Sequence, residues 1–285
     1  MSTASESIAS EHTQPLVLLF GDAPNHRALA NKIAKKLPVD AVVIEQRKRG
    51  SKRTFRQLAE RVYQKLRFGK IDQAWANMQA KMTEDYPNWP DVPQIRVNNV
   101  NAPAVREHLQ QLAPGMMMVS GTRIVRKPIL ELAPPRGILN LHTGLSPYVK
   151  GGPNCTNWCI AERRFHLIGN TIMWIDAGID TGNLIATEAT PLQVGWSLSD
   201  LHIAVMEHAH ELYVRAAKAV WQGQQVPNVP QSAIAQGHTY YTRQWTNAKR
   251  AEMLRNWPKL KSELHTKAFK EAQGSLHLIS LVEAA

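Results

Sequence analysis

Two polar residues in the second half of the chain, an asparagine and a histidine, are spaced so that their side chains can act together. Asn140 and His142 lie two positions apart at the end of an apolar run, residues 137–142, which predicts a β-strand. Side chains two apart on a strand leave the same face, so an amide and an imidazole are presented together. Two acids, Asp176 and Asp180, follow in a glycine-containing turn, residues 176–182. Amide and imidazole groups can donate hydrogen bonds and a carboxylate can accept a proton, so either acid is a candidate to complete a reactive set.

The segment that follows the predicted strand has the composition of a ligand-binding loop. Residues 143–153 contain three glycines and two prolines. Glycine lets a backbone approach a ligand closely, and proline fixes the turns around it. This loop and the turn at residues 176–182 are therefore the expected walls of the site.

Metal binding is the main alternative use of the nearby side chains. Four residues of zinc-ligand type occur here: His142, Cys155, Cys159 and His166. The Cys-x-x-x-Cys spacing is loose for zinc, and two small buried side chains on one helix are the favoured interpretation. Glu207 and His210 lie one helical turn apart, as in di-iron proteins, but a second copy is absent and a polar helix face is favoured. We predict no metal.

Short apolar runs alternate with segments of helical periodicity in front of this site and after it. Strands are predicted over residues 16–20, 41–44, 95–97, 116–119, 137–142, 168–175 and 184–187, and helices over 24–37, 53–67, 71–82, 104–112 and 198–221. Strand–helix alternation predicts an α/β fold, with a doubly wound, mostly parallel, Rossmann-like sheet. In such sheets ligands bind outside the carboxyl ends of the strands, which is where Asn140 and His142 lie.

The chain divides into three regions by composition. Residues 1–14 are predicted to be a flexible N-terminus, residues 15–225 a catalytic domain, and residues 226–285 a linker with a short C-terminal extension. Residues 227–237 are rich in Gln, Pro and Gly, which is typical of a linker. Residues 247–270 have a helix-like pattern, without a run of short strands.

The bulk properties exclude several protein classes. The chain has 285 residues, of which 44% are hydrophobic, too many for a disordered protein. The first 13 residues contain no apolar run, so neither a signal peptide nor a membrane anchor is predicted, and no later run is long enough to cross a bilayer. Two cysteines cannot form a disulfide framework, which favours the cytoplasm. The net charge of +11 favours anionic partners: nucleic acid, phosphates or carboxylate-rich cofactors.

Two features of the sequence leave alternatives open. The densest basic run consists of Arg47, Lys48, Arg49, Lys52, Arg53 and Arg56, which form either a solvated face or a contact with a phosphorylated substrate. The aromatic residues after residue 237 include Tyr240, Trp245 and Trp257. They either stack on bases and sugar rings or dock the end of the chain onto its own domain.

The combination of motifs resembles the formyltransferase family that uses 10-formyltetrahydrofolate. Asn140-x-His142, the turn at residues 145–148 with two glycines after it, and the loop at residues 178–182 have the order and spacing of that family. The resemblance is dense over residues 137–185. It implies the formyltransferase fold and a catalytic trio of Asn140, His142 and Asp180. It also implies that the pterin of the folate lies against Ser120, Gly121, Thr122, Asp176 and Gly178.

The family divides by the amine that it formylates, and the resemblance leaves several acceptors open. Methionyl-tRNA formyltransferases carry a C-terminal barrel, and the helix-like pattern at residues 247–270 does not favour one. A nucleotide-linked amino sugar is the leading acceptor, followed by other small or phosphorylated amines. Nucleic acid is not favoured, no membrane is expected, and the sequence is compatible with a homodimer. A formyltetrahydrofolate hydrolase and a non-catalytic nucleotide or nucleic-acid binder are the alternatives from other classes.

Overall fold

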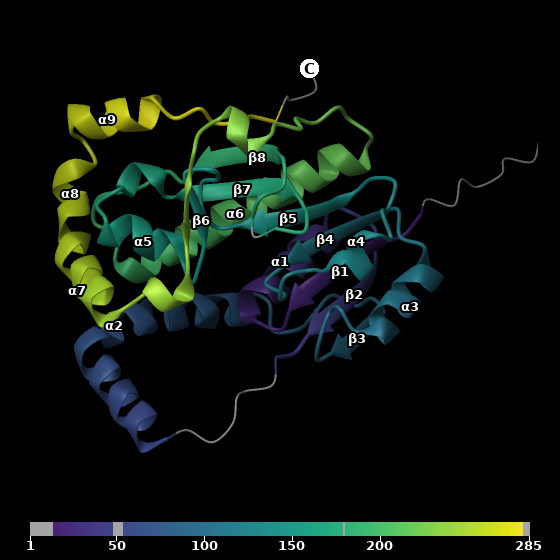
Figure 1. Cartoon of the computed structure of the whole chain (residues 1–285), viewed down its shortest axis with the longest axis horizontal. Helices are drawn as coiled ribbons and strands as arrows, with labels where there is room; N and C mark the ends of the chain where they lie inside the picture. Colours follow the sequence, from purple (N-terminus) through teal and green to yellow (C-terminus); the bar gives the residue numbers. More distant parts are fainter. Residues whose placement is uncertain (1–13, 48–53, 179, 282–285) are drawn as a thin grey trace, which may run out of the picture.

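The computed structural model describes residues 14–47, 54–178 and 180–281, and its centre is a seven-stranded sheet (Figure 1). The strands, in sheet order, are β3 (Gln94–Val97), β2 (Val39–Glu45), β1 (Leu16–Gly21), β4 (Met116–Ser120), β5 (Ile138–His142), β7 (Gly169–Trp174) and β8 (Leu184–Ala189). The first five are parallel to one another, whereas β7 pairs antiparallel with both β5 and β8. The predicted α/β fold with a mostly parallel sheet is confirmed.

Helices cover both faces of this sheet, which explains why its strands are apolar along their whole length. On β1, Leu16, Leu18 and Phe20 face α1 (Pro24–Ala34) and α6 (Leu198–Trp221). The residues between them, Val17 and Leu19, pack with the face that carries α3 (Pro103–Leu112) and α4 (Lys127–Leu130). Each fully buried aliphatic side chain of this kind contributes roughly 1.5–3 kcal/mol.

The segment predicted as two helices is one long helix, α2 (Phe55–Asp85). It begins with a capping box between Thr54 and Gln57, and its second half packs against α1 and α6. The first half projects beyond the sheet layers (Figure 1). Leu58, Val62 and Leu66 share one face, as the periodicity predicts, but that face is 53–80% exposed because no helix of the sheet layers lies over it.

The C-terminal part of the chain packs onto the domain along most of its length. Val229 forms a β-bridge with Leu184, and β9 (His238–Tyr240) pairs with β6 (Val149–Gly151) in a small parallel sheet. Residues 227–237, expected as a linker, are therefore bonded to the domain through their backbone. The sequence pattern missed this because the pairing joins residues 45 and about 90 positions apart.

Three short helices follow: α7 (Asn247–Asn256), α8 (Leu260–Glu263) and α9 (Lys267–Gly274). They lie beside α5 (Cys155–Ala161), where the Trp158 ring stacks on Tyr240 with centroids 4.4 Å apart and meets Trp245 edge-on at 4.9 Å. These aromatic residues dock the C-terminal part of the chain onto α5, one of the two expected roles. Within the described ranges, no helix has the length and apolarity required to cross a membrane.

Candidate active site

Strand β5 presents Asn140 and His142 on one face, as the two-residue spacing predicts. Asn140 pairs in register with Val119 of β4 and Met173 of β7. The strand is held from beneath by Tyr213 of α6, whose hydroxyl lies 3.0 Å from the Val119 amide nitrogen and 2.8 Å from the Leu139 carbonyl oxygen. Tyr213 is fully buried, so these bonds fix the strand that carries both polar side chains.

His142 and Asp180 form a pair. The Nδ1 atom of His142 lies 3.2 Å from Oδ2 of Asp180, and the Nε2 atom lies 3.2 Å from the carbonyl oxygen of Val149. Both ring nitrogens thus face acceptors, and the cationic form of the imidazole satisfies both. Oδ2 of Asp180 also accepts a hydrogen bond of 3.1 Å from the amide of Gly151, which joins the two predicted loops. His142 is only 8% exposed, so the pair is largely shielded from water.

The second acid of the same loop has a different environment. Asp176 accepts hydrogen bonds from the Gly178 amide at 3.0 Å and from the Thr181 hydroxyl at 2.7 Å. These bonds stay inside the loop and make an Asx turn. The structure therefore brings Asp180, and not Asp176, to His142. Gly182 closes the loop where a side chain does not fit, since a Cβ there would lie 1.7 Å from the Trp174 carbonyl oxygen.

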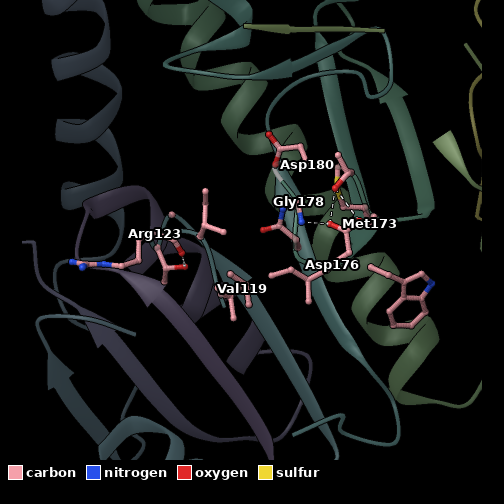
Figure 2. A pocket seen from close by; sticks show the side chains of 15 residues that line it. Val119, Arg123, Met173, Asp176, Gly178 and Asp180 are labelled. Carbon is pink, nitrogen blue, oxygen red and sulfur yellow. Dashed lines mark hydrogen bonds between the residues drawn. The ribbon is translucent and has the colours of Figure 1, made fainter. Parts of the chain in front are cut away.

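A cleft of about 120 Å³ lies beside the trio (Figure 2). Asn140 and Asp180 both line it, together with residues of the loop after β4 and of the β7–β8 loop. Its lining comprises Val119, Gly121, Thr122, Arg123, Ile124, Val125, Asn140, Met173, Trp174, Ile175, Asp176, Gly178, Asp180, Thr181 and Gly182. Figure 2 shows Arg123 on one side of the cleft and Gly178 and Asp180 on the other.

Four of the five residues expected to contact the pterin line this cleft: Gly121, Thr122, Asp176 and Gly178. Ser120 does not. It is 4% exposed, and its hydroxyl lies 3.2 Å from Nδ1 of His26. Burial, and then the charge of Arg47, lower the pKa of His26 to about 4, so this imidazole is neutral at physiological pH. Ser120 thus lies beneath the cleft and not in its wall.

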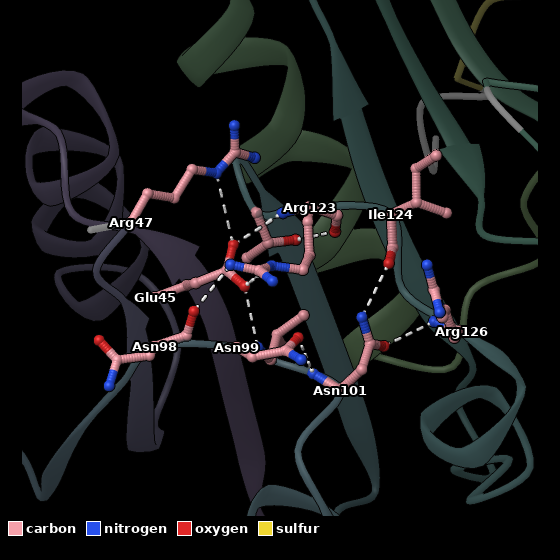
Figure 3. A network of polar contacts seen from close by, with 10 residues as sticks. Glu45, Arg47, Asn98, Asn99, Asn101, Arg123, Ile124 and Arg126 are labelled. Atoms are coloured by element: carbon pink, nitrogen blue, oxygen red, sulfur yellow. Dashed lines mark hydrogen bonds and ion pairs between the residues drawn. The ribbon is translucent and has the colours of Figure 1, made fainter. Parts of the chain in front are cut away.

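One wall of the cleft depends on a buried carboxylate that ends β2 (Figure 3). The Glu45 side chain has no exposed surface and accepts hydrogen bonds from the backbone amides of Val100 and Arg123 at 2.9 and 2.8 Å. The Arg123 guanidinium lies 2.6 Å from the same carboxylate, and Arg47 lies 3.7 Å away. Next to this network, Asn101 accepts from the Arg126 amide and donates to the Ile124 carbonyl. Glu45 therefore joins the loops after β3 and β4.

Of the basic run at residues 47–56, two arginines are described. Arg47 belongs to the Glu45 network, and Arg56 lies on the exposed first turn of α2. Lys48, Arg49, Lys52 and Arg53 lie outside the described residues.

The two cysteines are buried on α5, as expected for small packing residues. Sγ of Cys155 lies 3.5 Å from Nε2 of His142. Burial raises the pKa of Cys155 well above its usual value, so the thiol stays protonated and is no nucleophile. In the parts of the chain that the structure describes, no group of three His, Cys, Asp or Glu side chains could hold a metal ion.

Glu207 and His210, considered above as a di-iron pair, differ in how deeply they are buried. Glu207 pairs with Lys32, whereas His210 is fully buried and neither of its ring nitrogens has a hydrogen-bond partner. The prediction of a polar helix face is therefore wrong for His210, because this side of α6 packs into the core.

The family described as formyl transferase matches residues 5–217, about three quarters of the chain. The chain belongs to the formyl transferase family. The match covers β1 to β8 and most of α6, and with them Asn140, His142 and Asp180.

One relative matches about half of this chain in sequence. The methionyl-tRNA formyltransferase of Pelobacter propionicus is 31% identical over 146 residues, which are 51% of this chain and 45% of that protein. The chain thus matches less than half the length of this relative.

Two solved structures share the fold of this chain. Glycinamide ribonucleotide transformylase 1 of Symbiobacterium toebii has a TM-score of 0.52 at 19% identity, over 80% of this chain and all of that one. The N-formyltransferase of Helicobacter canadensis, solved with folinic acid and dTDP-3-aminofucose, has a TM-score of 0.53 at 14% identity, over 86% of this chain and 80% of that one.

The sequence patterns missed several residues that build the candidate site. Arg123, Ile124 and Val125 line the cleft one to three positions beyond the predicted Ser120–Gly121–Thr122 segment. Glu45 could have been found from the sequence, because an acid at the end of a buried strand needs hydrogen-bond or ion-pair partners. No sequence pattern indicates a role for Gln231, which donates a hydrogen bond to the backbone of the Asp180 loop.

Proposed function

We propose that this protein is an N-formyltransferase that moves a formyl group from 10-formyltetrahydrofolate to a primary amine. The observation that carries the proposal is the His142–Asp180 contact of 3.2 Å beside a cleft that Asn140 also lines. An amide donor, a cation and a carboxylate then meet at one place that is partly closed to water. Acyl transfer to an amine needs these three functions.

Each member of the trio has its own task in the proposed reaction. The amine nitrogen attacks the formyl carbon, and negative charge develops on the formyl oxygen. The Asn140 side chain lines the cleft, and we assign its N–H to this oxygen. The His142 cation contributes positive charge on the same strand face.

The proton of the attacking amine goes to Asp180. Oδ2 of this carboxylate is occupied by His142 and Gly151, whereas Oδ1 has no protein partner in the described residues. The bond between the formyl carbon and N10 of the folate then breaks, and N10 takes up a proton. One proton lost and one gained keep the enzyme unchanged over the cycle.

The lining of the cleft supports the proposed folate. Gly121 and Gly178 bring backbone to its rim, and Val119, Ile124 and Met173 provide apolar surface for a flat ring. Backbone amides and carbonyls with apolar neighbours are how proteins bind a planar heterocycle. We propose that the pterin lies there, against Gly121, Thr122, Asp176 and Gly178, with its formyl group toward Asn140.

A nucleotide-linked amino sugar remains the proposed acceptor. Arg47, Arg96 and Arg123 are each 42–60% exposed on the cleft side of the sheet and could contact a phosphate. In the residues after α6 that the structure describes, short helices accompany one strand, β9, in line with a small acceptor. Methionyl-tRNA is the second candidate, because the relative from Pelobacter propionicus that is 31% identical carries that name.

An acceptor screen tests the proposal. The purified protein is incubated with 10-formyltetrahydrofolate and, in separate reactions, with dTDP-amino sugars, phosphorylated amines or charged initiator tRNA. We expect tetrahydrofolate to appear only with an amine, fastest with an amino sugar. Fastest transfer to tRNA would replace the proposed acceptor and keep the reaction. Equal release of tetrahydrofolate in the absence of any amine would replace transfer by hydrolysis.

A further inference from the structure

We infer that Gln231, in the C-terminal segment, is a positioning residue that holds Asp180 against His142. The inference rests on the proposed role of Asp180. Nε2 of Gln231 lies 2.8 Å from the carbonyl oxygen of Asp180 and 2.9 Å from that of Gly182. A primary amide has two N–H groups, so one side chain satisfies both carbonyls.

These two bonds act on the loop backbone at Asp180 itself. Asp180 has a φ of +52°, in the left-handed region that residues other than glycine adopt uncommonly, although aspartate does so more often than most. The hydrogen bonds inside the loop belong to Asp176, four residues earlier. The carboxylate therefore needs an anchor from outside, and the carbonyl of the same residue receives one from Gln231.

Gln231 is itself fixed to the sheet. It is 7% exposed and begins the short helical turn η2 (Gln231–Ala233). Two residues earlier, Val229 exchanges backbone hydrogen bonds of 2.8 and 3.0 Å with Leu184, the first residue of β8. Strand β8 pairs with β7, and the loop that contains Asp180 connects these two strands. The Gln231 amide is therefore attached to the same part of the sheet as the loop that it bonds.

Asp180 is thus held from two sides. The Gly151 amide bonds its carboxylate, and Gln231 bonds its carbonyl. Loss of the second contact leaves the carboxylate free to leave His142, while the cleft and Asn140 stay in place. Removing the Gln231 donors is expected to lower kcat about 10–100-fold and to change the KM of the amine less than about threefold.

The test combines two substitutions. Gln231→Met keeps the length of the side chain without its donors. Asn228→Ala is the control, because Asn228 is exposed, lies on the same segment and bonds Asn183, with no contact to Asp180. We expect Gln231→Met to lower kcat as above and Asn228→Ala to change it less than about twofold. Single-turnover rates are measured on protein whose fold is checked by circular dichroism.

The decisive readout is the double variant Gln231→Met/Asp180→Asn. If Gln231 acts through Asp180, the double variant is no more than about threefold slower than Asp180→Asn alone. Losses that multiply would overturn the inference, as would a wild-type kcat for Gln231→Met, while leaving the proposed function intact. Wild-type kcat for Asp180→Asn would overturn the proposed role of Asp180 and this inference together.

Discussion

The substitution Asp180→Asn removes one charge and leaves the shape of the side chain almost unchanged. In the wild-type protein Oδ2 accepts bonds from His142 at 3.2 Å and from the Gly151 amide at 3.1 Å. The amide oxygen of asparagine can still accept from Gly151. It can neither take a proton from the amine nor stabilise a cation on His142. The expected defect is therefore in the chemical step.

The expected size of the loss in kcat follows from the short distance between His142 and Asp180. At 3.2 Å and an effective dielectric constant of ~20, the Coulomb attraction within the pair is about 5 kcal/mol before desolvation is subtracted. At about 1.4 kcal/mol for each factor of ten, this limits the effect to between three and four orders of magnitude. General-base catalysis is typically worth ~10²–10⁴. We expect kcat to fall by that range.

The assay is the rate of tetrahydrofolate formation with a saturating amine, and Asp85→Asn is the matched control. Asp85 is exposed at the end of α2, where it pairs with Lys81, so the same change of charge there should alter kcat less than about threefold. A kcat for Asp180→Asn above a tenth of the wild-type value would refute the reasoning. So would equal losses in the two variants.

Three further predictions concern the frame around the trio. Tyr213→Phe leaves the buried Val119 amide and Leu139 carbonyl without their partner, so the free energy of unfolding in urea should fall by about 1–3 kcal/mol; an unchanged midpoint would contradict this. Glu45→Gln removes the carboxylate that holds the loop after β4, so KM for the folate should rise more than kcat falls; a fall in kcat alone would contradict it. Burial lowers the pKa of His202 to about 4. Below pH 6.5 the unfolded chain therefore binds a proton on this imidazole that the folded protein excludes, so the free energy of unfolding should fall as the pH drops from 6.5 toward 4. The pH dependence of urea unfolding should become shallower in His202→Gln, and an identical dependence would be inconsistent with this assignment.

The parts of the fold that sequence patterns predicted are those in which burial repeats along the chain. Strands covered on both faces have uninterrupted apolar residues, as in Leu16–Gly21 and Met116–Ser120, so both were predictable. The break predicted between residues 67 and 71 was wrong because Gly69 is tolerated inside α2. Its Cα has open space around it, and a glycine costs an exposed helix only ~1 kcal/mol.

The site was predictable where its residues are close in sequence or follow a known pattern. Asn140 and His142 needed only the alternation of one strand, and the contact of Asp180 with His142 agrees with the choice of Asp180 over Asp176. Contacts between distant segments carry no local signal. Gln231 lies 51 residues from Asp180 in a segment whose composition is typical of a linker, and Glu45 meets the Arg123 amide 78 residues away.

The most direct test of the account is a stoichiometry measured on one reaction mixture. Tetrahydrofolate and N-formylated amine are quantified together over time, with and without the amine, for the wild-type protein and for Asn140→Ala. We predict equal amounts of the two products, none of either without the amine, and a loss of roughly 10²–10³ in rate for Asn140→Ala. Tetrahydrofolate formed without the amine, or full activity in Asn140→Ala, would contradict formyl transfer by this trio.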